Sequence, residues 1–128
     1  MTHNSVASQQ VLQNKAFLDW LYERKAKNAS GVVCSFHGDP ADQSPFSWHG
    51  YKYDTNDDYH LQTDKNSFCS VSTFLPNADG RIRRTKSQFS AMHALFIDDL
   101  GSGLGAKMPL TKLKLLPSVM IETSPENY

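Results

Sequence analysis

Two adjacent carboxylates, Asp98 and Asp99, follow the apolar run ALFI (94–97) and stand just before Gly101. Carboxylate oxygens are ligands that Mg²⁺ accepts in proteins, usually together with substrate phosphates. Two metal ions held in this way would activate an attacking hydroxyl group and stabilise the leaving oxygen. Neighbouring residues on a strand point to opposite faces, so both acids can meet one metal only where the strand ends or twists. The spacing leaves two hypotheses open: a metal site, and the commoner solvated turn at a strand end.

A second candidate is the basic segment RIRRTK (81–86), which holds four bases and no acid. The chain as a whole has 13 basic and 13 acidic residues, so its net charge is zero. Six of the acids lie in residues 39–64 beside one base, Lys52, and charge is therefore segregated along the chain. A local basic face could bind the phosphates of a template or a nucleotide, although a solvated turn explains it equally well. The candidates for this contact are Arg81, Arg83, Arg84 and Lys86.

The elements that must position these residues follow from hydrophobic periodicity and turn composition. A long polar stretch (37–66) is expected as a loop or insertion with a hairpin around WHGYKY, and PNADGR (76–81) as a turn. Helices are expected at 6–28, within 83–92 and at 110–116, and strands at 31–36, 67–75, 92–98 (buried) and 118–124. This order predicts an α/β or α+β fold with a mixed sheet of about four visible strands and flanking helices.

The bulk composition limits the class of protein. A chain of 128 residues, with 39% hydrophobic and 20% charged residues, is expected to be one globular domain or a piece of one. The sequence has no run of about 20 apolar residues. Its beginning, MTHNSVASQQ, lacks the order of a signal peptide. Two cysteines fit a reducing compartment, so we expect a cytoplasmic protein.

Other chemistry-bearing residues fit their motifs less well. The histidines and cysteines lack the C-x₂-C or H-x₃-H spacing of zinc sites. Tyr51 and Tyr53 are the candidate nucleophiles of a rolling-circle initiator, but the usual close pair of metal-binding histidines is reduced to His93. We expect Phe89 in the core rather than as a base-stacking surface. Glu122, in the last expected strand, is either a third acid near Asp98 and Asp99 or a solvent-facing residue.

Four segments taken in order resemble the archaeo-eukaryotic primase superfamily, and within it the RepB-like primase branch of plasmids, phages and integrated elements. They are NSFCSVSTF, RIRRTKSQF, HALFIDDLG and LPSVMIETSPENY, so the resemblance covers about residues 66–128 well and residues 1–65 only in outline. In that family one strand carries acidic metal ligands, and a later strand runs into a Thr/Ser-rich turn that contacts the nucleotide. The resemblance assigns metal binding and catalysis to Asp98 and Asp99, and nucleotide binding to Thr123, Ser124 and Asn127.

The resemblance implies a DNA-directed nucleotidyltransferase that makes or extends primers with Mg²⁺ or Mn²⁺. Its partners would be a DNA template and nucleoside triphosphates, with a replicative helicase as a further candidate. The family's two acids are spaced by one residue, its second motif ends in a histidine, and a third motif supplies a further acid; this sequence differs in all three.

These differences predict the N-terminal part of one primase-like domain, with a leading helix in 1–30 and its core in 67–128. As a 128-residue chain it would be inactive in primer synthesis and would self-associate through an exposed edge strand at 118–124. The alternatives are a non-catalytic nucleic-acid-binding replication protein and an inactive truncated gene product.

Overall fold

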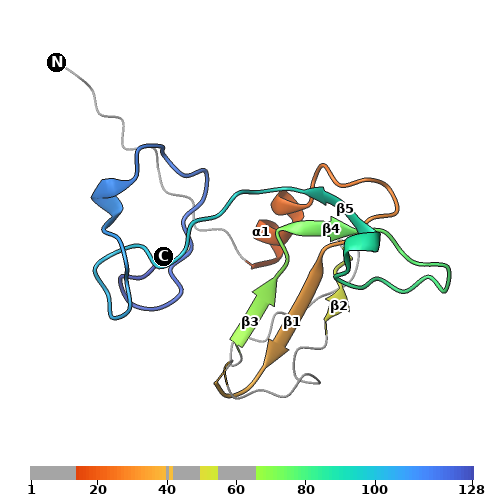
Figure 1. Cartoon of the computed structure of the whole chain (residues 1–128), viewed down its shortest axis with the longest axis horizontal. Coiled ribbons are helices and arrows are strands. Elements are labelled where there is room, and N and C mark those ends of the chain that lie inside the picture. Colours follow the sequence, from red (N-terminus) through yellow and green to blue (C-terminus); the bar gives the residue numbers. More distant parts are fainter. Residues whose placement is uncertain (1–13, 40, 42–49, 55–65) are drawn as a thin grey trace. The chain divides into compact units, whose positions relative to one another are not determined.

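The computed structural model describes residues 14–39, 41, 50–54 and 66–128 (Figure 1). The chain forms two compact units, Met1–Ala94 and Leu95–Tyr128. The first holds the regular helix and all the named strands, whereas the second is built from turns, isolated bridges and one short 3₁₀ helix. Within the described residues, no helix is long and apolar enough to cross a membrane.

A three-stranded antiparallel sheet forms the centre of the first unit. Its strands are β1 (Val32–Phe36), β2 (Tyr51–Lys52) and β3 (Asn66–Cys69), in the order β2-β1-β3 (Figure 1). The central strand β1 is rich in β-branched and aromatic residues, which favour a pleated, buried backbone. Four of its five side chains are buried. The sequence predicted this strand at 31–36, and the structure confirms it.

A second, two-stranded antiparallel sheet pairs β4 (Ser72–Phe74) with β5 (Phe89–Met92). Its register sets Ser72 opposite Met92 and Phe74 opposite Phe89, with a β-bulge between Thr73 and Phe74. The 3₁₀ helix η2 (Lys86–Gln88) leads directly into β5. The predicted turn at 76–81 is confirmed, because the Asn77 side chain accepts bonds from the backbone N–H groups of Asp79 and Arg81.

Helix α1 (Asn14–Leu21) closes the core of this unit. Leu18, Leu21 and the following Tyr22 are buried and pack with Val33 and Tyr53. The Tyr22 hydroxyl donates to the carbonyl of Ser70 at 2.6 Å, and its ring lies 5.8 Å from that of Tyr53. Tyr22 therefore ties the helix to the chain segment that leaves the first sheet.

The segment 67–75 is two strands and not the single strand that its alternation predicted. Ser70 causes the break, because its side chain accepts a bond from the N–H of Val32 and donates to the carbonyl of Ser72. These bonds replace ladder bonds, so the chain leaves β1 and begins the second sheet. The predicted helix at 6–28 is also too long at its C-terminal end: α1 ends at Leu21, and turns follow it. Its predicted part before residue 14 lies outside the described residues.

The predictions for the later elements were wrong in three places. The strand of the 92–98 region is β5, which ends at Met92, and Leu95, Phe96 and Ile97 are 62–92% exposed. The partner strand β4 has only three residues. Beyond it, the N–H of His93 donates to the carbonyl of Val71, and the pairing of the two strands ends there. The predicted helix at 110–116 is only the 3₁₀ turn η3 (Leu110–Lys112), and 118–123 has no regular structure. The exposed edge strand expected there is therefore absent from the structure.

The fold class is α+β, as predicted. The strands that were expected in one mixed sheet form two small antiparallel sheets with one α-helix in the described part of the chain.

Replacing Tyr22 with Phe should destabilise the first unit by about 1–3 kcal/mol, because it leaves the Ser70 carbonyl without its buried donor. Urea unfolding followed by circular dichroism measures this loss. Tyr51→Phe is the matched control, since the Tyr51 side chain is 60% exposed, and its effect should stay within about 0.5 kcal/mol. Equal effects at the two positions would show that the Tyr22 hydroxyl does not link the helix to this segment.

The same tyrosines make the unit sensitive to alkaline pH. Burial raises the pKa of Tyr22 and of Tyr53 well above the ordinary value, and the bond to Asp19 raises the pKa of Tyr53 further. The unfolded chain then loses these protons first, so the free energy of unfolding falls as pH rises beyond about 10. Urea titrations between neutral and alkaline pH should show a shallower fall in the Tyr22→Phe, Tyr53→Phe double variant. Identical slopes would contradict this assignment.

Candidate metal and nucleotide site

The two predicted metal ligands lie in a turn, residues 98–101, which we name the acidic turn. Asp99 adopts a left-handed backbone conformation with φ of 60°, and its N–H donates to Oδ1 of Asp98 at 2.8 Å. Aspartate tolerates this conformation better than most residues. The change in direction comes from Asp99 itself and from Gly101, with φ of 125°. A turn therefore positions the acids, and the expectation of a strand end was wrong.

Lys107 lies against the acidic turn. Its Nζ is 2.5 Å from Oδ2 of Asp99, and its backbone N–H donates to the Asp99 carbonyl at 2.7 Å. The bond to Asp99 raises the pKa of Lys107 above its ordinary value. The Lys107 side chain is 80% exposed, so this ion pair is weak and screened by salt. The Lys107 ammonium group is thus the cation that pairs with the Asp99 carboxylate.

The predicted nucleotide-binding residues form a second turn, residues 124–127, which we name the SPEN turn. The N–H of Asn127 donates to the carbonyl of Ser124 at 2.9 Å, with Pro125 second and Glu126 third in the turn. Glu126 has φ of 59°, as the third residue of a type II turn requires. Thr123 continues the pairing, because its N–H donates to the carbonyl of Asn127 at 2.9 Å.

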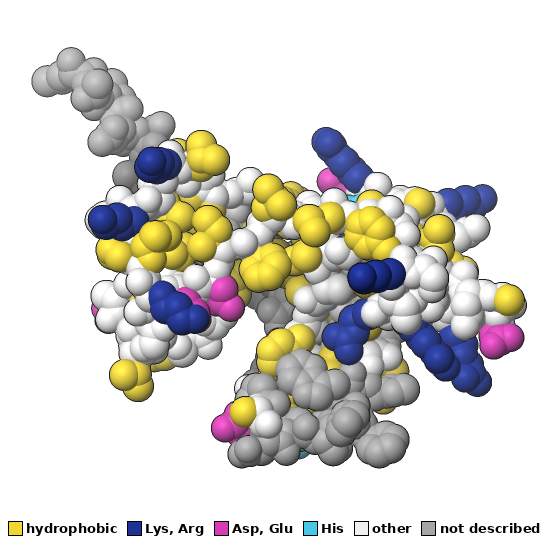
Figure 2. All heavy atoms as spheres, in the orientation of Figure 1, with side chains coloured by type: hydrophobic (Ala, Val, Ile, Leu, Met, Phe, Trp, Pro, Cys, Tyr) yellow, Lys and Arg dark blue, Asp and Glu magenta, His cyan; other side chains and the backbone are white. Residues whose placement is uncertain are grey.

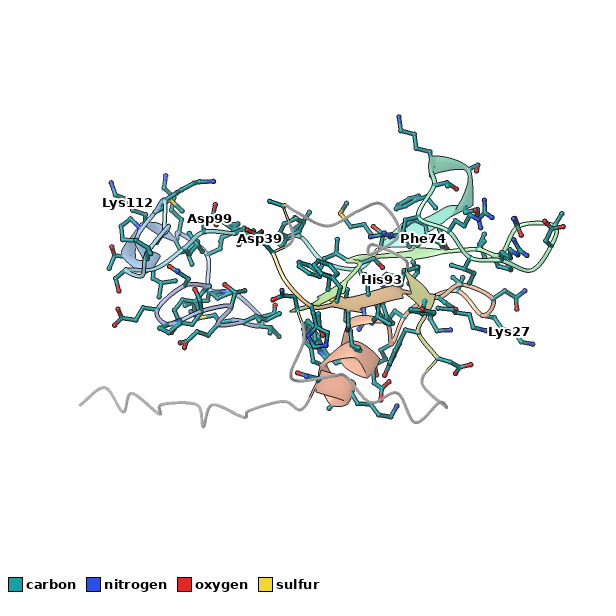
Figure 3. All side chains as sticks on the ribbon, turned by 90° about the horizontal axis from the view of Figure 1, so that it is seen from below. Lys27, Asp39, Phe74, His93, Asp99 and Lys112 are labelled. Carbon is teal, nitrogen blue, oxygen red and sulfur yellow. The ribbon has the colours of Figure 1, made fainter. Side chains whose placement is uncertain are left out.

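Backbone hydrogen bonds join the two turns. Leu100 and Tyr128 exchange both N–H···O bonds, at 3.0 and 2.8 Å, and the carbonyl of Glu126 accepts from Ser102 and Gly103. Leu100 is 6% exposed and anchors the contact. These bonds therefore join residues 100–103 to residues 126–128, which the sequence separates by more than twenty positions. Figure 3 labels Asp99 in this C-terminal unit.

Two glycines make this close approach possible. A Cβ atom on Gly101 would clash with the carbonyl of Glu126, and one on Gly103 would clash with the carbonyl of Pro125 and the side chain of Asn127. The glycine-rich segment 101–103 is therefore a packing surface for the end of the SPEN turn.

The remaining candidates are placed as follows. Glu122 accepts a hydrogen bond from the Tyr128 hydroxyl at 2.9 Å, and this bond raises the pKa of Tyr128. Glu122 is therefore engaged with Tyr128 and is not a third acid beside Asp98 and Asp99. Across the described ranges, no group of three His, Cys, Asp or Glu side chains could hold a metal. Tyr53 is 2% exposed and donates to Asp19, so it does not fit the hypothesis of a nucleophile. His49 and His60 lie outside the described residues.

The four basic residues predicted to bind nucleic acid lie in the other unit and are all exposed. Gln88 holds their loop in place: its side-chain amide donates to the carbonyls of Leu75 and Arg81 at 3.0 and 2.8 Å. Phe89, expected in the core, is 48% exposed at the end of this loop, so that expectation was wrong.

Sequence reasoning missed Lys107, which pairs with Asp99. The signal for Lys107 was the glycine-rich segment 101–105, because glycines allow the chain to turn back toward the acids.

Comparison of the chain with family models, with curated proteins and with solved structures finds no match. The resemblance to primases rests on the four sequence segments quoted above.

Replacing Gly103 with Ala should separate the two turns, because overpacking costs about 1–3 kcal/mol. Hydrogen exchange should then accelerate by about tenfold or more at the amides of Leu100 and Tyr128. Gly105→Ala is the matched control: its φ of 90° also disfavours a side chain, but an added Cβ there meets no atom within 4 Å. Equal acceleration in both variants would show that the close approach at Gly103 does not hold the turns together.

Proposed function

We propose that the C-terminal unit binds a divalent cation together with a nucleoside triphosphate, as part of a primase-polymerase-like nucleotidyltransferase of a mobile element, in the cytoplasm. The observation that supports this most is the backbone pairing of the acidic turn with the SPEN turn. Metal-ligand and phosphate-binding chemistry are thereby combined in one small unit.

The donor set fits a hard cation. Mg²⁺ is commonly held by one or two carboxylates plus substrate phosphates and keeps several waters, so two acids are enough for this mode of binding. Asp98 is exposed, and the Asp99 side chain is 40% exposed, which leaves oxygens of both accessible. When bound, Mg²⁺ or Mn²⁺ would supply charge neutralisation at the phosphates and activation of the attacking hydroxyl.

Thr123 and the SPEN turn contribute hydroxyl groups for the phosphates. Thr123 and Ser124 are exposed, and the Ser124 hydroxyl accepts a bond from the Asn127 amide at 2.9 Å, which leaves its own proton to donate. The Asn127 amide also donates to the carbonyl of Leu104 at 2.7 Å. Both of its protons are thus used within the unit, so we assign Asn127 the role of positioning Ser124 rather than contacting the nucleotide itself.

The competing class, a non-catalytic nucleic-acid-binding protein, draws on the exposed basic segment in the other unit. Metal-dependent nucleotide binding separates the first class from the others, and salt-sensitive binding of DNA without metal separates the second class from an inactive gene product. An inactive gene product would show neither.

Asp98→Asn and Asp99→Asn should each weaken Mn²⁺ binding by about tenfold or more, because opposite charges a few ångströms apart attract by more than about 1 kcal/mol even in water. Electron paramagnetic resonance of free Mn²⁺ measures this, and Mg²⁺ should compete. Asp79→Asn, at an exposed acid in the other unit, is the control.

Lys107→Gln should act in the opposite direction and raise the affinity for Mn²⁺ severalfold, since it removes the cation that pairs with Asp99. Unchanged Mn²⁺ affinity in the Asp98→Asn, Asp99→Asn double variant would contradict the proposal.

A further inference from the structure

The loop between β4 and β5 carries a pocket of about 400 Å³ on the surface of the first unit. Figure 2 shows Lys and Arg side chains gathered around this part of the molecule, with hydrophobic side chains between them. The lining combines two aromatic rings with two cations, and it consists of Phe74, Arg84, Thr85, Lys86 and Phe89. A packing cavity in a hydrophobic core would be lined by apolar side chains, whereas this pocket has cations and an exposed ring on one concave surface.

The two phenylalanines have different roles in this pocket. Phe74 is buried, with 8% of its surface exposed, whereas Phe89, its partner across the strands, is 48% exposed. Figure 3 labels Phe74 on the sheet. A half-exposed ring on a strand provides a flat apolar surface at the rim of the pocket. A nucleobase can stack on such a surface, and the gain does not depend on the identity of the base.

The stretch of sequence around Phe89 carries charge of one sign. Residues 80–97 contain four bases and no acid, and all four bases are exposed. Arg84 and Lys86 lie on the wall of the pocket next to Phe89. Cations beside an aromatic surface match a nucleotide, which has an anionic phosphate next to a flat base.

The pocket is held in shape by its own hydrogen bonds. The N–H of Leu75 donates to the carbonyl of Gln88 at 2.7 Å, and the buried Gln88 side chain fixes the carbonyls of Leu75 and Arg81. Thr85 and Gln88 are bonded through their side chains at 3.2 Å. Because these bonds fix the loop before any ligand arrives, binding costs little ordering of the backbone.

We propose that this pocket binds one nucleotide of a single-stranded nucleic acid, with the base stacked on Phe89 and the phosphates at Arg84 and Lys86. A duplex does not fit this mode, because its bases are stacked on each other and cannot cover the ring. The inference rests on the proposed function for its biological role, as a contact to the template. The binding itself needs no metal, so it can be tested separately.

The test compares two labelled oligonucleotides of about 20 units by fluorescence anisotropy in EDTA: oligothymidylate, and an abasic strand with the same phosphates. Phe89→Ala should weaken the binding of oligothymidylate by about 5- to 150-fold and leave the abasic strand within about twofold. Phe89→Trp, which keeps a flat ring, should retain binding of oligothymidylate and also shows that the position tolerates change. Thermal unfolding by circular dichroism verifies that each variant is folded.

The phosphate contacts have a different signature. Lys86→Gln should weaken both oligonucleotides and reduce the salt dependence of binding by about 0.7 in the logarithmic slope, whereas Lys112→Gln, in the other unit, should change neither. Equal losses for both strands in Phe89→Ala, no loss for either, or no binding by the wild-type chain would overturn the proposal. Since EDTA is present throughout, these outcomes are independent of whether Asp98 and Asp99 bind Mn²⁺.

Discussion

The C-terminal unit depends on one close contact, the backbone pairing of residues 100–103 with 126–128. This unit has no named strand and no α-helix among its residues, so it lacks the regular ladders that usually satisfy backbone groups. The exchange of bonds between Leu100 and Tyr128 and the double acceptance by Glu126 replace those ladders. Gly101 and Gly103 permit this approach, because any side chain there would meet the opposite backbone. This contact joins the segment that follows the acids to the end of the SPEN turn.

The first unit follows a different principle, in which a small core is fixed by a few buried polar groups. Thr73 is fully buried, and its hydroxyl lies 2.9 Å from Nε2 of His93, while Tyr22 and Tyr53 direct their hydroxyls to Ser70 and Asp19. A buried polar group stabilises a structure only when it is paired, so each of these contacts specifies the chain path at one point. The path after Ser70 is the important one, because it starts the second sheet and thereby presents the loop that carries the basic segment.

The sequence predicted those features that local rules encode. Strand β1 follows from its β-branched residues, the turn at 76–81 from Asn77 and Gly80, and the α+β class from the order of helical and extended segments. The segments 92–98 and 118–124 were misassigned because an apolar run indicates burial only when a partner exists. The partner strand β4 ends after three residues, and no strand in the described part of the chain pairs with 118–124. The pairing of residues 100–103 with 126–128 could not be predicted from local rules, since it depends on contacts between segments distant in sequence.

The most direct test of the account is paramagnetic broadening by Mn²⁺ in the two-dimensional NMR spectrum of the ¹⁵N-labelled chain. If the acidic turn and the SPEN turn form one cation site, substoichiometric Mn²⁺ should broaden the amides of Asp98, Asp99 and Ser124 together, at the same concentration, and leave Asp79 sharp. Added Mg²⁺ should restore all three signals. Broadening that spares these residues, or that follows exposed acids such as Asp79 equally, would contradict the claim that the two turns build a metal and nucleotide site.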